Sequence, residues 1–344
     1  MNDRLGRLAA LLDEPLLVTD GTNLRYLTGF VSSNGALLVE RDRVRLFTDF
    51  RYVEAAREVP DVEVVMTRRN LIGELAEILS GRIAFERSLS YGLYEVLRDG
   101  GLDLVPTSGK VESLRAVKDA DELDALRRAC AITDRVFDRL TQVPFVGRTE
   151  REVSWDLTQL FVEEGGEGLA FESIVGAGPT GARPHARAGN RVIGEGELVV
   201  IDAGTTIDGY ASDYTRTLAT GPLDDDAREA YDTVLAAQQA ALDGIRAGVS
   251  GAEADALARA VIDSGEFSGK LGHGLGHGLG LDVHEAPRLS TDSTDTLVAG
   301  NVVTVEPGIY VEGRFGVRIE DDVVVTDDGI ENLTGFRKDL VVVS

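Results

Sequence analysis

The chain has 344 residues, 43% of them hydrophobic, and a formal net charge of −24 at pH 7. The length exceeds the usual size of one domain and predicts two, and the absence of a long uninterrupted apolar run argues against a membrane span. The negative charge argues against nucleic acid and anionic membranes as partners, because both are polyanions.

Residues 1–115 are expected to form a small α/β domain. Their first residues lack a basic segment followed by an apolar stretch, so no secretory signal is expected and the predicted location is the cytoplasm. The polar turn at residues 40–43 predicts a hairpin, and Asn70 is expected to cap a helix. Short apolar runs predict strands at residues 16–18, 36–39, 44–47, 62–65, 83–85 and 102–105. No catalytic constellation occurs here, so the chemistry is expected in the second domain.

Residues 116–344 are expected to form the second domain, which opens with a long helix over residues 119–141. This helix carries Cys130, the only cysteine of the chain, which excludes an intramolecular disulfide and is expected to be buried. Capping-box patterns at Thr149 and Ser250 predict the starts of two further helices. Hairpins that precede and follow a pair of helices indicate two similar halves.

Two aspartates flank the first predicted hairpin of the second domain. An apolar run ends at Asp202, and Asp213 follows after the turn signal Asp208-Gly209. We therefore expect Asp202 and Asp213 to lie side by side. A charge at the end of a buried strand is costly without a partner, which predicts a metal ion or an arginine next to Asp202.

Two glutamates occupy equivalent places on a second predicted hairpin. Glu306 follows one apolar run, Glu320 ends another, and Gly313 lies midway between them, so the two carboxylates are expected to meet across paired strands. Two inward-facing pairs of like charges would be strongly destabilising without counter-ions. Two divalent cations would neutralise the four carboxylates, which predicts a dinuclear metal hydrolase.

All four histidines of the chain lie at positions that suit a site. His185 ends a loop rich in Gly and Pro, and the others, His273, His277 and His284, fall within the stretch GHGLGHGLGLDVHE. The glycines disfavour a helix and allow the backbone to approach a ligand closely. His277 is the predicted fifth ligand, because neutral imidazole is a common metal donor. Oxygen donors with one nitrogen and no sulfur favour Mn²⁺, with Co²⁺, Fe²⁺ or Zn²⁺ as substitutes.

The five residues Asp202, Asp213, His277, Glu306 and Glu320 resemble the ligand signature of the pita-bread metallopeptidases. Their contexts are DAG, DYTRT, GHGLGHGLGLDVHE, EPG and VRIED. The segments NLRYLTGF and LFTDFRY are similar to the amino-terminal domain of the proline-specific branch, Xaa-Pro dipeptidase (prolidase) and aminopeptidase P, and LRAVKDADELDALRRA resembles the domain junction. The resemblance covers nearly the whole chain. It implies an α/β (α+β) fold, in which a small creatinase-like N-terminal α/β domain precedes a C-terminal pita-bread catalytic domain.

The resemblance also implies an activity, namely hydrolysis of the Xaa-Pro bond at the amino end of dipeptides or short peptides by a homodimeric enzyme. A hydroxide that bridges two metal ions would attack the carbonyl before proline, and Glu306 would accept the proton of this water while remaining a ligand. His284 would hydrogen-bond the developing oxyanion.

The remaining site residues take their expected roles from the same resemblance. His185 and His273 are expected to line the substrate pocket. His185 is also expected to take part in proton movement. Arg288 is expected to meet a substrate carboxylate. Arg318 is expected to brace the carboxylates, and a purely structural role for it remains equally open.

Three other functions remain as alternatives. Methionine aminopeptidase is disfavoured by the extra domain and by His185 and His273. A creatinase-like hydrolase without metal, and a non-catalytic binding module of the same fold, are disfavoured by the intact set of five ligands. The sequence does not decide between dipeptides and longer peptides as substrates.

Overall fold

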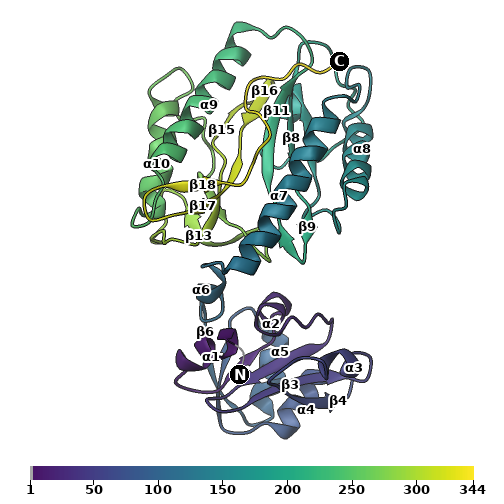
Figure 1. The fold of residues 1–344 in the computed structure, drawn as a ribbon, viewed down its shortest axis with the longest axis vertical. Coiled ribbons are helices and arrows are strands. Elements are labelled where there is room, and N and C mark those ends of the chain that lie inside the picture. The colour runs from purple at the N-terminus through teal and green to yellow at the C-terminus, as the bar shows by residue number, and fades with distance from the viewer. Residues whose placement is uncertain (1–2) are drawn as a thin grey trace. The chain divides into compact units, whose positions relative to one another are not determined.

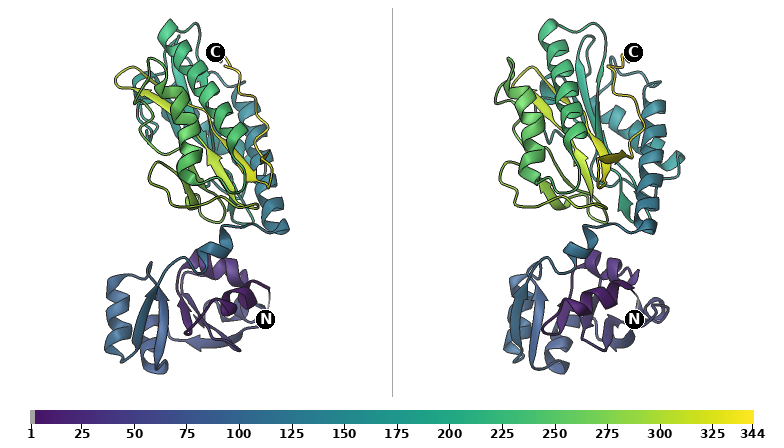
Figure 2. Two further views of the ribbon diagram at one scale, coloured as in Figure 1. Left: turned by 90° about the vertical axis from the view of Figure 1, so that its left-hand side faces the viewer. Right: turned by 60° about the vertical axis from the view of Figure 1, so that its left-hand side comes forward.

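The computed structural model describes residues 3–344. The contacts divide the chain into two compact units, Met1–Arg115 and Ala116–Ser344. Figures 1 and 2 show the helices and strands of each unit. Within the described part of the chain, none of the helices combines the length and the apolar character that a membrane crossing requires.

The first unit is built on one mixed sheet of six strands in the order β4-β3-β2-β1-β5-β6. The strands β1, β2 and β3 pair antiparallel, which confirms the predicted hairpin, and the outer pairs are parallel. All six predicted strands are present, with no end shifted by more than two residues. Their bounds are β1 Leu16–Val18, β2 Gly35–Val39, β3 Val44–Asp49, β4 Glu63–Thr67, β5 Arg82–Glu86 and β6 Asp103–Thr107.

Helices complete the first unit. The predicted cap at Asn70 is confirmed, because its side chain accepts a hydrogen bond from the backbone N–H of Gly73. Leu71 and Leu75 then pack against the buried strand residues, including Leu17. The helices are α1 Asp3–Ala10, α2 Gly21–Thr28, α3 Val53–Ala56, α4 Leu71–Ile78, α5 Tyr91–Asp99 and α6 Glu112–Arg115.

The second unit begins with two helices and a hairpin. The long predicted helix is α7 (Ala120–Leu140), in which Cys130 is buried, and the capping box at Thr149 starts α8 (Glu150–Glu163). Both helices share one hydrophobic core with the sheet β11-β8-β7. The strands are β7 Ile174–Ala177, β8 Leu198–Ala203, β9 Thr206–Ile207, β10 Tyr210–Ala211 and β11 Tyr214–Ala219.

A second pair of helices and more strands follow. The helices α9 (Asp225–Gly244) and α10 (Gly251–Asp263), the latter with the predicted capping box at Ser250, lie to the left of the strands in Figure 1, and α7 and α8 lie to the right. The sheet order is β13-β12-β14-β17-β18, with a separate β15-β16 ribbon. The strands are β12 Gly276–Gly278, β13 Glu285–Leu289, β14 Val302–Val305, β15 Gly308–Val311, β16 Phe315–Arg318, β17 Asp321–Val325 and β18 Ile330–Asn332.

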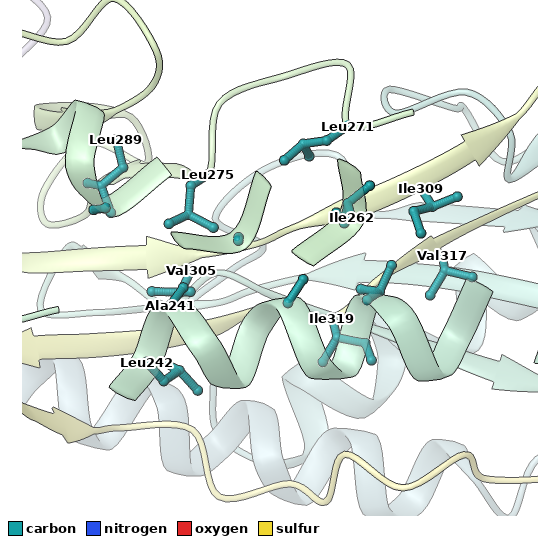
Figure 3. Packing of buried hydrophobic residues seen from close by; sticks show 14 of the residues in the cluster. Ala241, Leu242, Ile262, Leu271, Leu275, Leu289, Val305, Ile309, Val317 and Ile319 are labelled. Atoms are coloured by element: carbon teal, nitrogen blue, oxygen red, sulfur yellow. The ribbon is translucent and has the colours of Figure 1, made fainter. Parts of the chain in front are cut away.

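Strand alternation decides which side chains reach the core of this second half. Figure 3 shows Val305, Val317 and Ile319 packed with side chains of α9 and α10 such as Ala241 and Ile262. Because successive side chains of a strand point to opposite faces, the residues next to these in the chain are turned away from this core. Those residues are Glu306, Arg318 and Glu320.

The first half repeats this arrangement. Ile201 and Ala203 of β8 and Tyr214 of β11 pack in the core beneath α7 and α8. By the same alternation, Asp202 and Thr215 lie on the opposite face. Each half therefore presents acidic side chains on the face of its strands that is not covered by its own helices.

Candidate metal centre

The first carboxylate pair lies on the predicted hairpin. Asp208 and Gly209 form its turn with φ values of 51° and 82°, as a two-residue hairpin turn requires. The register places Asp202 opposite Thr215, so Asp213 is its diagonal neighbour and not its direct partner. The two aspartates are thus neighbours across the hairpin on a diagonal, and both side chains line the same cavity.

The second carboxylate pair lies at a break between two ladders. The β14–β17 ladder ends with Val305 opposite Asp321, and the β15–β16 ladder begins with Gly308 opposite Arg318. The same register carried through the break places Glu306 opposite Glu320. Both glutamates line the cavity that also contains the two aspartates.

His277 lies in the short strand β12, between β13 and β14. The glycines on either side allow this close packing, because a Cβ at Gly276 would lie 2.0 Å from the carbonyl oxygen of Thr304 and one at Gly278 2.2 Å from that of Ala286. These two glycines therefore allow the neighbouring strands to pack closely, whereas the sequence predicts that they allow the backbone to approach a ligand. The strand directs the His277 ring to the carboxylates, with Nε2 3.4 Å from Glu306 Oε1 and 3.8 Å from Asp213 Oδ2.

These side chains form a set of donors that fits a divalent cation. Ligand atoms of Asp213, His277 and Glu320 all lie within 4.8 Å of one another. One oxygen of Asp202, Oδ1, is buried and has no hydrogen-bond partner among the described residues. A buried carboxylate oxygen without a partner is costly, and a cation beside it would remove that cost. Oxygen donors with a single imidazole suit Mn²⁺ and related ions.

The pKa values of the buried Glu306 and Glu320 are shifted in the direction that reduces the negative charge of the site. Burial raises the pKa of Glu306 to about 8, with Asp202 adding to the rise and Arg318 opposing it. Burial and then the charge of Asp213 hold the pKa of Glu320 well above its usual value. Burial also lowers the pKa of His277 to about 4, so its ring is neutral and able to donate a lone pair at neutral pH.

Arg318 is the cation that the protein itself supplies to the carboxylates. Its guanidinium donates to Asp202 Oδ2 at 2.6 Å, to the Thr215 hydroxyl at 2.8 Å and to the Tyr310 hydroxyl at 2.9 Å. Thr215 in turn donates to Glu320 Oε2 at 2.7 Å. The expectation that Arg318 braces the carboxylates is confirmed, and it also supplies the arginine that Asp202 requires.

The other predicted residues line the same cavity, whose volume is about 820 Å³, within the usual range of ligand sites. His273 Nε2 lies 3.0 Å from the Tyr310 hydroxyl, and the His284 ring lies 4.3 Å from that of His277 between centroids. His185 and Arg288 are exposed on the cavity wall. All the site residues named from the sequence are thus brought to one cavity.

Some contributors were missed by the sequence analysis. Thr215 and Tyr310 complete the Arg318 network, and the carboxylate of the buried Asp322 accepts the backbone N–H of Asp213 at 3.0 Å. Thr215 and Asp322 lie two residues beyond Asp213 and Glu320, a spacing that places side chains on the same face of a strand. This spacing is the sequence signal from which Thr215 and Asp322 could have been predicted. The contact of Tyr310 with His273 had no such signal, because the two residues lie on different elements.

Comparisons with known proteins extend over both units. Residues 124–327 match the model of metallopeptidase family M24, and residues 6–117 match that of the creatinase/prolidase N-terminal domain. An Xaa-Pro dipeptidase of Pyrococcus furiosus is 32% identical over 99% of this chain and 100% of its own length.

Solved structures agree with these matches. An Xaa-Pro dipeptidase from Bacillus anthracis has a TM-score of 0.95 and 37% identity, and the match covers 99% of each chain. An X-Pro aminopeptidase from Thermotoga maritima has a TM-score of 0.89 and 34% identity, over 98% of this chain and 100% of that one. The predicted fold class, a creatinase-type α/β domain followed by a pita-bread domain, is confirmed.

Proposed function

The chain belongs to metallopeptidase family M24, as its motifs predicted, and on this basis we propose that it hydrolyses the Xaa-Pro bond at the amino end of dipeptides or short peptides. The observation that carries the proposal is the convergence of four carboxylates and one neutral imidazole in a cavity of about 820 Å³. The names of the similar proteins support proline as the residue after the cut bond.

Asp202, Asp213, His277, Glu306 and Glu320 would hold two divalent cations, Mn²⁺ being the favoured ion. The unpartnered oxygen of Asp202 and the raised pKa values of the buried carboxyls support this assignment. When bound, the cations would polarise the substrate carbonyl and make water a nucleophile near neutral pH. Co²⁺, Fe²⁺ and Zn²⁺ remain as substitutes.

Glu306 is the residue proposed to hold a proton during the reaction. Its Oε1 lies 3.4 Å from the Thr304 hydroxyl, which donates to it, and 3.4 Å from His277 Nε2. A carboxylate beside the attacking water can accept a proton from it and pass that proton on. The proton taken up here is available for the proline nitrogen, which must be protonated to leave.

His284 is proposed to donate a hydrogen bond to the carbonyl oxygen as it becomes anionic. Its exposed ring stands in the cavity beside His277, and a donor aimed at a developing oxyanion stabilises the transition state. His185 and His273 would line the space for the substrate. The exposed guanidinium of Arg288 would meet the substrate carboxylate.

A preference for proline follows from the chemistry of its bond. The amide before proline has no N–H, and the ring fixes the backbone dihedral. A pocket fitted to that ring needs no acceptor at the nitrogen, whereas any other residue would bury an unsatisfied N–H there. We also propose, from the same resemblance, that the protein is a homodimer in the cytoplasm.

A comparison of four substrates tests this function. The metal-loaded protein is incubated with Ala-Pro, Ala-Pro-Ala, Ala-Ala and Met-Ala-Ser, and kcat/KM is measured for each. We expect proline-containing substrates to be cleaved far faster than the other two. Comparable values for Met-Ala-Ser would favour a methionine aminopeptidase instead. The ratio of Ala-Pro to Ala-Pro-Ala distinguishes a dipeptidase from an aminopeptidase.

A further inference from the structure

A buried ion pair lies next to the proposed oxyanion donor. Lys118 Nζ lies 2.5 Å from Glu285 Oε1, and the two side chains are only 1% and 7% exposed. A buried ion pair seldom stabilises a fold more than apolar side chains of the same volume would. Stability alone therefore does not explain this pair. Glu285 directly follows His284 in the chain, which suggests a role in placing that residue.

The backbone of Lys118 is held in place by several contacts. Its N–H donates to the carbonyl oxygen of Gly300 at 2.9 Å, and the neighbouring Val117 forms a β-bridge with Asn301. The Asn301 side chain also donates to the carbonyl oxygen of Ala116 at 2.8 Å. These contacts fix the point from which the lysine side chain extends to Glu285.

Glu285 links the two ends of the loop that carries His284. It is the first residue of β13 and lies opposite Gly278, at a register shift between His277 and Gly278. Its carboxylate rests against Gly280 so closely that a Cβ there would lie 2.6 Å from Oε1. The side chain of the residue that follows the loop thus contacts the residue at which the loop begins.

The ring of His284 depends on this loop for its direction. Within the described residues it has no hydrogen-bond partner, and it packs against the ring of His277. The side chain is exposed to the cavity. The position of the ring is therefore set by the backbone of residues 280–285. Hydrogen bonds of Gly280 with Ala211 and Asp282 hold the start of this segment, and the Glu285 carboxylate, paired with Lys118, packs against the same residue.

We propose that the Lys118–Glu285 ion pair is a positioning device, which fixes the loop of residues 280–284 and so aims His284 at the substrate carbonyl. The inference rests on the proposed function of His284 in catalysis. Neither residue of the pair is required to touch the substrate. The pair would act on the rate of the chemical step through geometry, because a small misplacement of a catalytic group lowers turnover steeply.

The variant Lys118→Met/Glu285→Leu tests the proposal, because it replaces both charges of the pair with apolar side chains and so does not leave one of them buried without the other. We expect its Tm and its Mn²⁺ stoichiometry to stay near those of the wild type. Its kcat should fall about 10- to 100-fold with little change in KM. Lys118→Arg, which keeps the ion pair, should retain most of the wild-type kcat. The exposed pair Arg127–Glu331 provides a control, since Arg127→Met/Glu331→Leu should leave kcat unchanged.

A second measurement does not depend on activity. The chain has four histidines, so the imidazole protons give four assignable NMR signals in the metal-free protein. In the double variant the His284 signal should move, because its ring leaves its place beside His277, while the His185 signal stays. If the double variant does not fold, Glu285→Gln serves the same comparison.

An unchanged His284 signal, or a wild-type kcat in the folded double variant, would overturn the positioning role. A wild-type protein that cleaves no Xaa-Pro substrate would refute the proposed function alone, because the NMR comparison would still decide whether the pair positions His284.

Discussion

Arg318 and Asp202 are joined by a buried hydrogen bond of 2.6 Å between Nη2 and Oδ2, while the other carboxylate oxygen of Asp202 has no partner among the described residues. One half of this carboxylate is therefore satisfied by the protein. Under the proposed function, the other half would bind a cation. This division explains how a strongly acidic cavity can fold and still require a cation.

Asp202→Asn should remove one metal ligand without unfolding the protein, because the amide keeps the shape of the side chain. Turnover is expected to fall at least about 100-fold, since a lost cation takes several kcal/mol of transition-state stabilisation with it. Bound metal per chain, measured by elemental analysis, should fall in parallel. Asp208→Asn in the exposed turn is the matched control and should change neither quantity. Full activity of Asp202→Asn at saturating Mn²⁺ would refute the ligand assignment.

His284→Ala should separate catalysis from metal binding. Loss of one donor to a developing oxyanion lowers the rate by about 10²–10³, so kcat should fall within this range. The metal content should remain that of the wild type, whereas His277→Ala should lose metal. If His284→Ala binds no metal, then His284 is a ligand and the roles of the two histidines have to be exchanged.

Arg318→Met should destabilise the protein most strongly when no metal is bound. The substitution leaves Asp202 charged, buried and unpaired, which costs about 3–5 kcal/mol of unfolding free energy. Mn²⁺ should recover part of this loss. Arg314→Met, on the exposed turn of the same hairpin, should cost less than about 1 kcal/mol. Equal destabilisation by the two substitutions, measured by denaturant unfolding, would contradict the bracing role of Arg318.

The pH dependence of stability should reverse when metal binds. Since the pKa of Glu306 is raised to about 8 in the folded metal-free protein, the folded state holds a proton that the unfolded chain has already released above its usual pKa. Stability must then fall as pH rises towards 8. His277, with its pKa lowered to about 4, acts in the opposite direction but only below its usual value of 6.5. The clear window is therefore pH 6.5 to 8.

Thermal unfolding in a chelator should accordingly show a falling Tm from pH 6.5 to 8. Mn²⁺ binding must displace the proton, so its affinity should rise over the same window, and calorimetry in buffers of different ionisation enthalpy should detect proton release. A metal-free Tm that rises steadily through this range would show that these carboxyls are ionised without metal.

Much of the site could be predicted from local patterns. The apolar runs that end at Asp202 and Glu320 predicted that both carboxylates lie at the ends of buried strands, where a charge needs a partner. The register of the first hairpin was also available. A two-residue turn at Asp208-Gly209 pairs the flanking residues, and the same register places Asp202 opposite Thr215.

Contacts between distant segments could not be predicted in this way. Tyr310 contacts His273 only through the tertiary packing of β15 against the glycine-rich segment. Lys118 and Glu285 are separated by most of the second unit, and no periodic pattern connects them. Such pairs depend on the tertiary packing of both halves, which a local sequence pattern does not encode.

Release of free proline from Ala-Pro, measured for the metal-stripped protein before and after addition of Mn²⁺, tests the proposed function most directly. We expect no turnover without metal, turnover that saturates with Mn²⁺, and far slower cleavage of Ala-Ala under the same conditions. The proposal would be contradicted by Mn²⁺ binding to the five-residue site without release of proline, or by equal cleavage of Ala-Ala and Ala-Pro.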